Sequence, residues 1–213
     1  MARGLDALLA LPFADTARVA VSGLSGGGWQ TILISALDPR VTISVPVVMV
    51  SSYFFGGCAC ESGLPIHRSA EHFVNNAMIA ALAAPRPLLV VSDGKDWTQH
   101  VPQIEYPFLC KIYGYYGAAS NVANVHLPDE GHDYGPSKRA AMIRFVAKQF
   151  GLKLQPALAG RVVAPNGIVI NSLSGVSGAG RSASVDMSFT ELNENIRAYK
   201  IGRHQHIPEI ETV

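Results

Sequence analysis

The sequence predicts an α/β fold: a parallel sheet with helices on both faces, followed by a small α+β segment. Short apolar runs alternate with helical patterns over the first two-thirds of the 213 residues. The expected strands are residues 18–22, 41–50, 88–92 and 122–127. Strands that are apolar throughout are typical of a parallel sheet covered on both faces.

Helical spacing of apolar side chains predicts three helices. Residues 26–37 form the first, which ends before Pro39 because proline cannot continue the helical hydrogen bonds. A second surrounds residues 104–115. The third spans 136–150 and is capped by Gly151.

The character of the sequence changes near residue 151, where the alternation of strands and helices stops. A glycine- and serine-rich stretch, 172–184, follows. We therefore expect two domains, 1–151 and 152–213.

Composition narrows the classes of protein to consider. Apolar residues make up 48% of the chain and charged residues 15%, as in a folded globular protein. The net charge of +1 gives no electrostatic reason to expect nucleic acid or an anionic membrane as partner. The longest apolar run, 41–50, is too short to span a bilayer. No secretory signal is visible at the N-terminus, so we expect a cytoplasmic protein.

The segment Gly23-Leu24-Ser25-Gly26-Gly27 carries the strongest chemical signal. It follows an expected strand and opens an expected helix, as a nucleophile elbow does. Such a turn exposes the serine hydroxyl and aims the next amide at a developing oxyanion. We predict Ser25 as nucleophile and Gly26 as oxyanion donor; the alternative is a glycine-rich turn without chemistry.

A catalytic serine needs a base, and the base needs an acid to orient it. Asp93 and Asp96 follow the third strand, where strand ends meet the elbow. We favour Asp96, on the outgoing loop, and keep Asp93 as the alternative acid. His132 follows the fourth strand and is the predicted base. The other histidines considered are interpreted as structural (His126) or as solvated residues of connections and helix starts (His67, His72 and His100).

The elbow, the segment Gly56-Gly57-Cys58-Ala59-Cys60-Glu61 and residues 80–87 resemble bacterial acetylxylan-esterase-like α/β-hydrolases. The resemblance covers about residues 5–151. It implies a partial α/β-hydrolase sheet, a Ser25–His132–Asp96 triad, no cofactor, and a small-molecule ester as substrate, with acetyl groups on carbohydrate as one class. A prolyl-oligopeptidase-like peptidase is the alternative within the same fold.

The family also has strands before the elbow, including a loop with a second oxyanion donor. We expect these to be missing, and loss of one donor costs roughly 10²–10³ in rate. A second copy of the chain could complete the sheet. Cys58 and Cys60 make a poor zinc site without a second pair, so we expect no metal and interpret them as local structure.

Residues 167–181 and 191–211 resemble a different enzyme, N-acetyl-γ-glutamyl-phosphate reductase. The resemblance spans about 153–213 and implies that Arg181 lies in an active-site loop and that His204 or His206 assists a cysteine. The expected cofactor-binding turn and catalytic cysteine do not occur. We therefore expect no reductase activity, and the alternatives to a hydrolase are a reductase-derived binding fragment or a fusion product without activity.

Overall fold

The computed structural model describes residues 2–52, 66–68 and 70–154. By its contacts the chain divides into two units, Met1–Lys153 and Leu154–Val213. The predicted α+β segment, with Arg181, His204 and His206, lies outside the described residues. So do Cys58 and Cys60.

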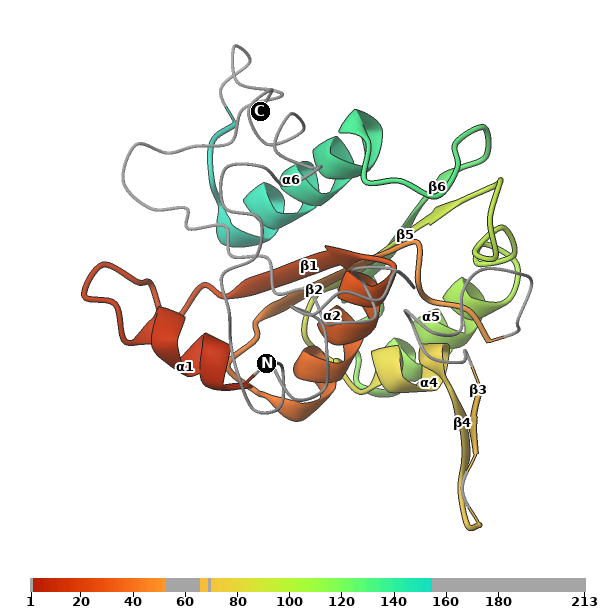
Figure 1. Cartoon of the computed structure of the whole chain (residues 1–213), viewed down its shortest axis with the longest axis horizontal. Coiled ribbons are helices and arrows are strands. Elements are labelled where there is room, and N and C mark those ends of the chain that lie inside the picture. Colours follow the sequence, from red (N-terminus) through yellow and green to blue (C-terminus); the bar gives the residue numbers. More distant parts are fainter. Residues whose placement is uncertain (1, 53–65, 69, 155–213) are drawn as a thin grey trace, which may run out of the picture. The chain divides into compact units, whose positions relative to one another are not determined.

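A four-stranded parallel sheet forms the centre of the first unit (Figure 1). Its order is β1-β2-β5-β6, and its strands are β1 (Ala20–Leu24), β2 (Ile43–Val47), β5 (Leu88–Asp93) and β6 (Val122–Leu127). Each neighbouring pair is parallel. The predicted parallel sheet is confirmed, and the carboxyl ends of all four strands meet at one edge.

One predicted strand is too long. The apolar run 41–50 pairs in the sheet only over Ile43–Val47. Val48 has a φ of 42°, which a β-branched residue rarely adopts, so the extended conformation ends there. The residues beyond it stay buried but leave the strand.

Helices cover both faces of the sheet, as predicted (Figure 1). Helices α2 (Gly26–Leu37), α4 (Asn76–Ala81) and α5 (Glu105–Tyr115) lie on one face and α6 (Pro136–Phe150) on the other. Strand β5 packs against helices on both faces of the sheet. Leu88 and Val90 belong to the core under α4 and α5, while Leu89 and Val91 belong to the core under α6. The continuous apolar sequence of β5 follows from this two-sided burial.

The helix ends agree with their sequence signals. Helix α6 begins at Pro136 and is closed by Gly151, which has a φ of 65°.

Two further short helical elements lie in the described part of the first unit. A short 3₁₀ turn, η1 (Ala119–Asn121), leads into β6. At the other end of the chain, α1 (Ala2–Leu9) buries Leu5 in a small separate cluster.

A small antiparallel hairpin was not predicted. It consists of β3 (Ile66–Arg68) and β4 (Phe73–Asn75) and runs directly into α4. Three-residue strands are too short to show a periodicity of two, so the sequence carries little signal for them. His67 therefore lies on a strand, and its assignment to a connection or helix start was wrong.

Candidate active site

The predicted nucleophile, Ser25, lies in the turn between β1 and α2. Its backbone has φ 51° and ψ −114°, a strained conformation for any residue but glycine. The Ser25 amide donates to the carbonyl of Val47 on β2 at 3.1 Å, and the Ser25 carbonyl accepts from the Trp29 amide in α2 at 2.9 Å. Strand and helix together therefore hold the strained turn.

Two glycines around Ser25 are required by close approach of the backbone. A Cβ on Gly23 would lie 2.4 Å from the carbonyl carbon and oxygen of Gly27. A Cβ on Gly28 would lie 2.6 Å from the Cβ of Met49. Gly27 itself has open space where a Cβ would stand. The backbone is thus crowded at the first glycine of the turn and near the start of α2.

Gly26 is the first residue of α2. Amides of the first helical turn have no partner within the helix and lie at its positive end. The position of Gly26 directly after Ser25 suits donation to an anion that forms on a group bound to the serine.

His132 and Asp96 meet directly. The Nδ1 of His132 lies 2.6 Å from Oδ2 of Asp96. The other carboxyl oxygen of Asp96 accepts from the amide and the hydroxyl of Thr98, both at 2.6 Å. Burial would raise the pKa of Asp96, but the hydrogen bonds from His132 and Thr98 outweigh it and hold that pKa below its ordinary value. Asp96 is therefore an ionised, fixed acceptor for the imidazole.

Asp93, the alternative acid, has a different environment. It is completely buried, and within the described residues neither carboxyl oxygen has a hydrogen-bond partner. Burial raises the pKa of Asp93 to about 7, and the Asp96 carboxylate acts in the same direction. The structure thus brings His132 to Asp96 and leaves Asp93 behind the pair.

The loops that carry Asp96 and His132 are joined through their backbones. Gly94 donates to the carbonyl of Leu127 at 3.0 Å, and Lys95 donates to that of Glu130 at 3.1 Å. A Cβ on Gly94 would lie 2.1 Å from the carbonyl oxygen of Pro128. This close approach explains why a glycine stands two residues before Asp96.

Trp97 links the histidine to the elbow side of the sheet. Its ring lies edge-on to His132, with centroids 5.5 Å apart. Its Nε1 donates to the carbonyl of Val48 at 3.2 Å. Val48 follows Val47, the residue that accepts the amide of Ser25. His132 and Ser25 are thus anchored to adjacent residues at the end of β2.

A second link runs through Tyr134, two residues after His132. Its hydroxyl is hydrogen-bonded to the hydroxyl of Ser22 on β1. β1 and β6 are the two outer strands of the described sheet, yet the loop after β6 reaches back to the strand that leads into Ser25. The loop of His132 and the turn of Ser25 therefore lie together at the carboxyl ends of the strands.

The remaining histidine of this region is structural. His126 lies on β6, and its Nδ1 is 2.9 Å from the hydroxyl of Ser92 on β5. This agrees with its interpretation from the sequence. The two residues fix the pairing of the strands from which the acid and base loops leave.

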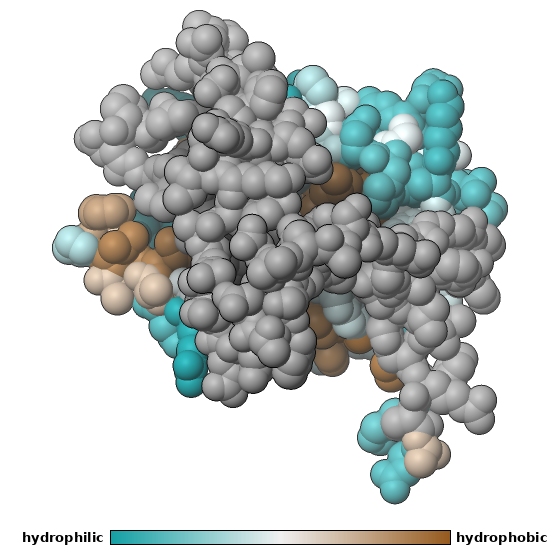
Figure 2. Space-filling view, in the orientation of Figure 1, coloured by the Kyte–Doolittle hydropathy of each residue, from teal (hydrophilic) through white to brown (hydrophobic). Residues whose placement is uncertain are grey.

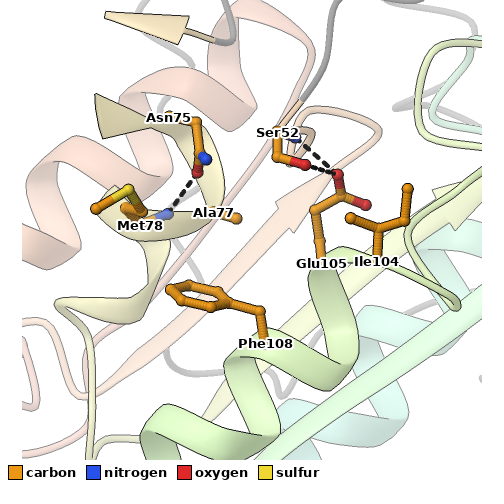
Figure 3. A pocket seen from close by; sticks show the side chains of 7 residues that line it. All are labelled: Ser52, Asn75, Ala77, Met78, Ile104, Glu105 and Phe108. Atoms are coloured by element: carbon orange, nitrogen blue, oxygen red, sulfur yellow. Dashed lines mark hydrogen bonds between the residues drawn. The ribbon is translucent and has the colours of Figure 1, made fainter. Parts of the chain in front are cut away.

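A recess of about 210 Å³ opens between α4 and α5 (Figure 3) and is lined by Ser52, Asn75, Ala77, Met78, Ile104, Glu105 and Phe108. The buried Glu105 accepts from the Ser52 amide at 2.7 Å and from its hydroxyl at 2.5 Å. None of the residues predicted as nucleophile, base or acid lines this recess.

The surface of the first unit is hydrophilic in some places and apolar in others. Figure 2 shows hydrophilic residues near the loop that follows β6 and apolar residues around α1.

Among the described residues, no group of three His, Cys, Asp or Glu side chains lies where it could hold a metal ion. In the same part of the chain, no helix is both long and apolar enough to cross a bilayer.

Sequence reasoning missed Lys138, whose ammonium contacts the loop of His132. A signal was present: a lysine in the first turn of a helix is unfavourable beside the positive end of the helix dipole. It also missed Thr98 and Tyr134, for which no pattern in one sequence gives a sign.

The first part of the chain is similar to solved esterases. Methylesterase BT1017 matches 71% of this chain at 53% identity, with a TM-score of 0.65, and the match covers 34% of that protein. Glucuronoyl esterases match at lower identity and show the fold alone. One from Caldicellulosiruptor kristjansonii is 18% identical, with a TM-score of 0.54, over 80% of this chain and 52% of its own.

The last part is similar to another enzyme. The family described as "Semialdehyde dehydrogenase, dimerisation domain" matches residues 147–213. The N-acetyl-gamma-glutamyl-phosphate reductase of Geobacillus sp. (strain WCH70) is 50% identical over 60 residues, which are 28% of this chain and 17% of that protein. That of Pelodictyon phaeoclathratiforme is 66% identical over 44 residues, 21% of this chain and 13% of its own.

The chain is thus similar to two different enzyme families. Both resemblances predicted from the sequence, to an esterase and to the reductase, are confirmed. The chain spans about a third of the length of the methylesterase and about a sixth of the curated reductase. The solved esterases are named for methyl and glucuronoyl esters, so the acetyl group stays a prediction.

Proposed function

We propose that the esterase-like part of this chain hydrolyses carboxylic esters, with Ser25 as nucleophile, His132 as general base and Asp96 as the acid. The 2.6 Å contact between His132 and Asp96, at the sheet edge that carries the strained Ser25, supports this most strongly. An ionised carboxylate on Nδ1 fixes the tautomer in which Nε2 can accept a proton.

The reaction follows in two steps. The Ser25 Oγ bonds to the carbonyl carbon of the ester while His132 takes the proton of the Ser25 hydroxyl. The Gly26 amide stabilises the oxyanion that forms on the carbonyl oxygen. The alcohol leaves with the proton from His132, giving an acyl-Ser25. Water, deprotonated by His132, then releases the acid and restores the serine.

The substrate class is an ester of a small molecule, with carbohydrate esters as the first choice. The sequence resemblance favours an acetyl group on a sugar hydroxyl, while the similar methylesterase favours a methyl ester of a sugar acid. Turnover of p-nitrophenyl acetate, an acetylated sugar and a methyl uronate by the whole chain would separate the two. Activity must disappear in Ser25→Ala and His132→Ala; folded wild-type protein that turns over none of the three would refute the proposal.

The reductase-like part supports a second role, that of an association module. The matched family is described as a dimerisation domain. The esterase-like part offers a separate place for association, because β1 is an edge strand of the described sheet. A second copy could pair at this edge. Light scattering of the whole chain would give the mass of a dimer; a monomer at high concentration would refute this role. We expect no NADPH binding, which fluorescence would detect.

A further inference from the structure

Lys138 is a fully buried cation. It lies in the first turn of α6 and has no exposed surface. Lysine is almost never fully buried unless it is paired, and a cation is disfavoured at this end of a helix. Its position therefore has to be balanced by strong local contacts.

These contacts surround His132. The ammonium of Lys138 donates to the carbonyl of Gly131 at 2.7 Å, to Oδ1 of Asp133 at 2.9 Å and to Oε2 of Glu130 at 3.2 Å. The first two partners are the neighbours of His132 on either side. One ammonium on α6 thus holds Glu130, Gly131 and Asp133, and the remaining residue of 130–133 is His132, the predicted base.

The same ammonium also faces the strand of the acid. It lies 3.6 Å from Oδ2 of Asp93, and both side chains are completely buried. Asp93 stands at the end of β5, three residues before Asp96. Burial would lower the pKa of Lys138, but its bonds to Asp133 and Glu130 outweigh burial and raise that pKa, so the group stays charged.

We propose that Lys138 is a positioning residue for His132: it fixes the loop 130–133 so that the imidazole stays on Asp96. This inference rests on the proposed hydrolase function. Lys138 lies behind the loop, so it acts through His132 and not on the substrate. A catalytic group displaced by about 1 Å costs on the order of 10²-fold in rate.

The test compares Lys138→Met with Lys148→Met, a matched change at an exposed position of the same helix. We expect Lys138→Met to lower kcat for p-nitrophenyl acetate by roughly 10- to 100-fold while KM stays within about twofold. The downfield proton NMR signal of the His132–Asp96 hydrogen bond should weaken or vanish. Both should be unchanged in Lys148→Met. A folded Lys138→Met with normal kcat and an intact signal overturns the proposal, even if its melting temperature is lower.

Two further variants keep the test decisive. If Lys138→Met does not fold, Asp133→Ala removes an exposed partner of the ammonium and should still weaken the signal and lower kcat; no change in either overturns the proposal. In the double variant Lys138→Met with Asp93→Asn, no buried carboxylate is left facing the lost charge. Low kcat that persists there supports positioning, and restored kcat overturns it. If the wild type is inactive, the hydrolase proposal fails and the NMR signal alone decides the role of Lys138.

Discussion

The elbow and the base loop reach the same edge of the sheet by different means. Ser25 is held through its backbone. Its amide donates a hydrogen bond to β2, its carbonyl accepts one from α2, and two nearby glycines leave no room for a side chain. His132 is held by polar side chains, with Asp96 on its ring and Lys138 under its loop. Steric fit and backbone hydrogen bonds hold Ser25, whereas charged side chains hold His132 and its loop.

The two regions should therefore fail in different ways. A single methyl group added at Gly23 or Gly28 should damage the fold before it damages the chemistry. Removal of a charge near His132 should damage the chemistry while the fold survives.

Asp96→Asn should give the largest loss. An amide in place of the carboxylate favours the wrong tautomer of His132, which costs about 10⁴-fold in kcat in a serine triad. Asp93→Asn is the matched control, and its kcat should stay within about tenfold of wild type because Asp93 does not touch the ring. Steady-state ester hydrolysis measures both; equal losses would show that the acid has been assigned to the wrong residue.

Asp93→Asn should instead change how stability depends on pH. The folded state binds the Asp93 proton more tightly, with a pKa of about 7 against 3.8. Stability in the wild type is therefore lost as pH rises from about 4 to about 7, by on the order of 4 kcal/mol. Asparagine has no such titration, so its urea unfolding free energy should be flatter over this range. Parallel curves for the two proteins would contradict the prediction.

Gly23→Ala should destabilise the protein by about 2–3 kcal/mol, because the new methyl group meets backbone atoms of Gly27 that cannot move aside. Gly27→Ala, four residues along, has open space and should be neutral or stabilising by about 0.5 kcal/mol. Thermal or urea unfolding compares the two. Equal stabilities would mean that the turn is not constrained by steric fit.

Trp97→Phe should have the smallest effect. It removes the indole donor to Val48 but keeps an aromatic ring beside His132. We expect a loss of about 1–2 kcal/mol in stability and a change of about threefold in kcat. Urea unfolding and steady-state hydrolysis measure the two. A loss of activity as large as in Asp96→Asn would assign Trp97 a direct part in the chemistry.

The main elements could be predicted because their signals are local. Helices α2 and α6 begin and end where glycine, proline and the apolar spacing place them. The end of β2 could not be predicted, because Val48 continues the apolar run and leaves the strand through its backbone conformation, with a φ of 42°. The hairpin of β3 and β4 was too short to leave a pattern.

The candidate site was predictable in part for the same reason. Motif and chain order predict Ser25, Asp96 and His132 as the site, and the structure brings His132 and Asp96 together. The environment of each was not predictable, because burial of Asp93 and the contacts of Lys138 join residues from β5, the base loop and α6. Such proximity is created by folding and has no fixed spacing in the sequence.

Covalent labelling shows whether Ser25 is a nucleophile activated by His132. A fluorophosphonate forms a stable adduct only with a serine whose proton is removed by a positioned base. Mass spectrometry of the labelled whole chain should find one adduct, on the peptide containing Ser25, and it should disappear in His132→Ala. A folded protein that takes up no label, or labelling at another serine, would contradict the account.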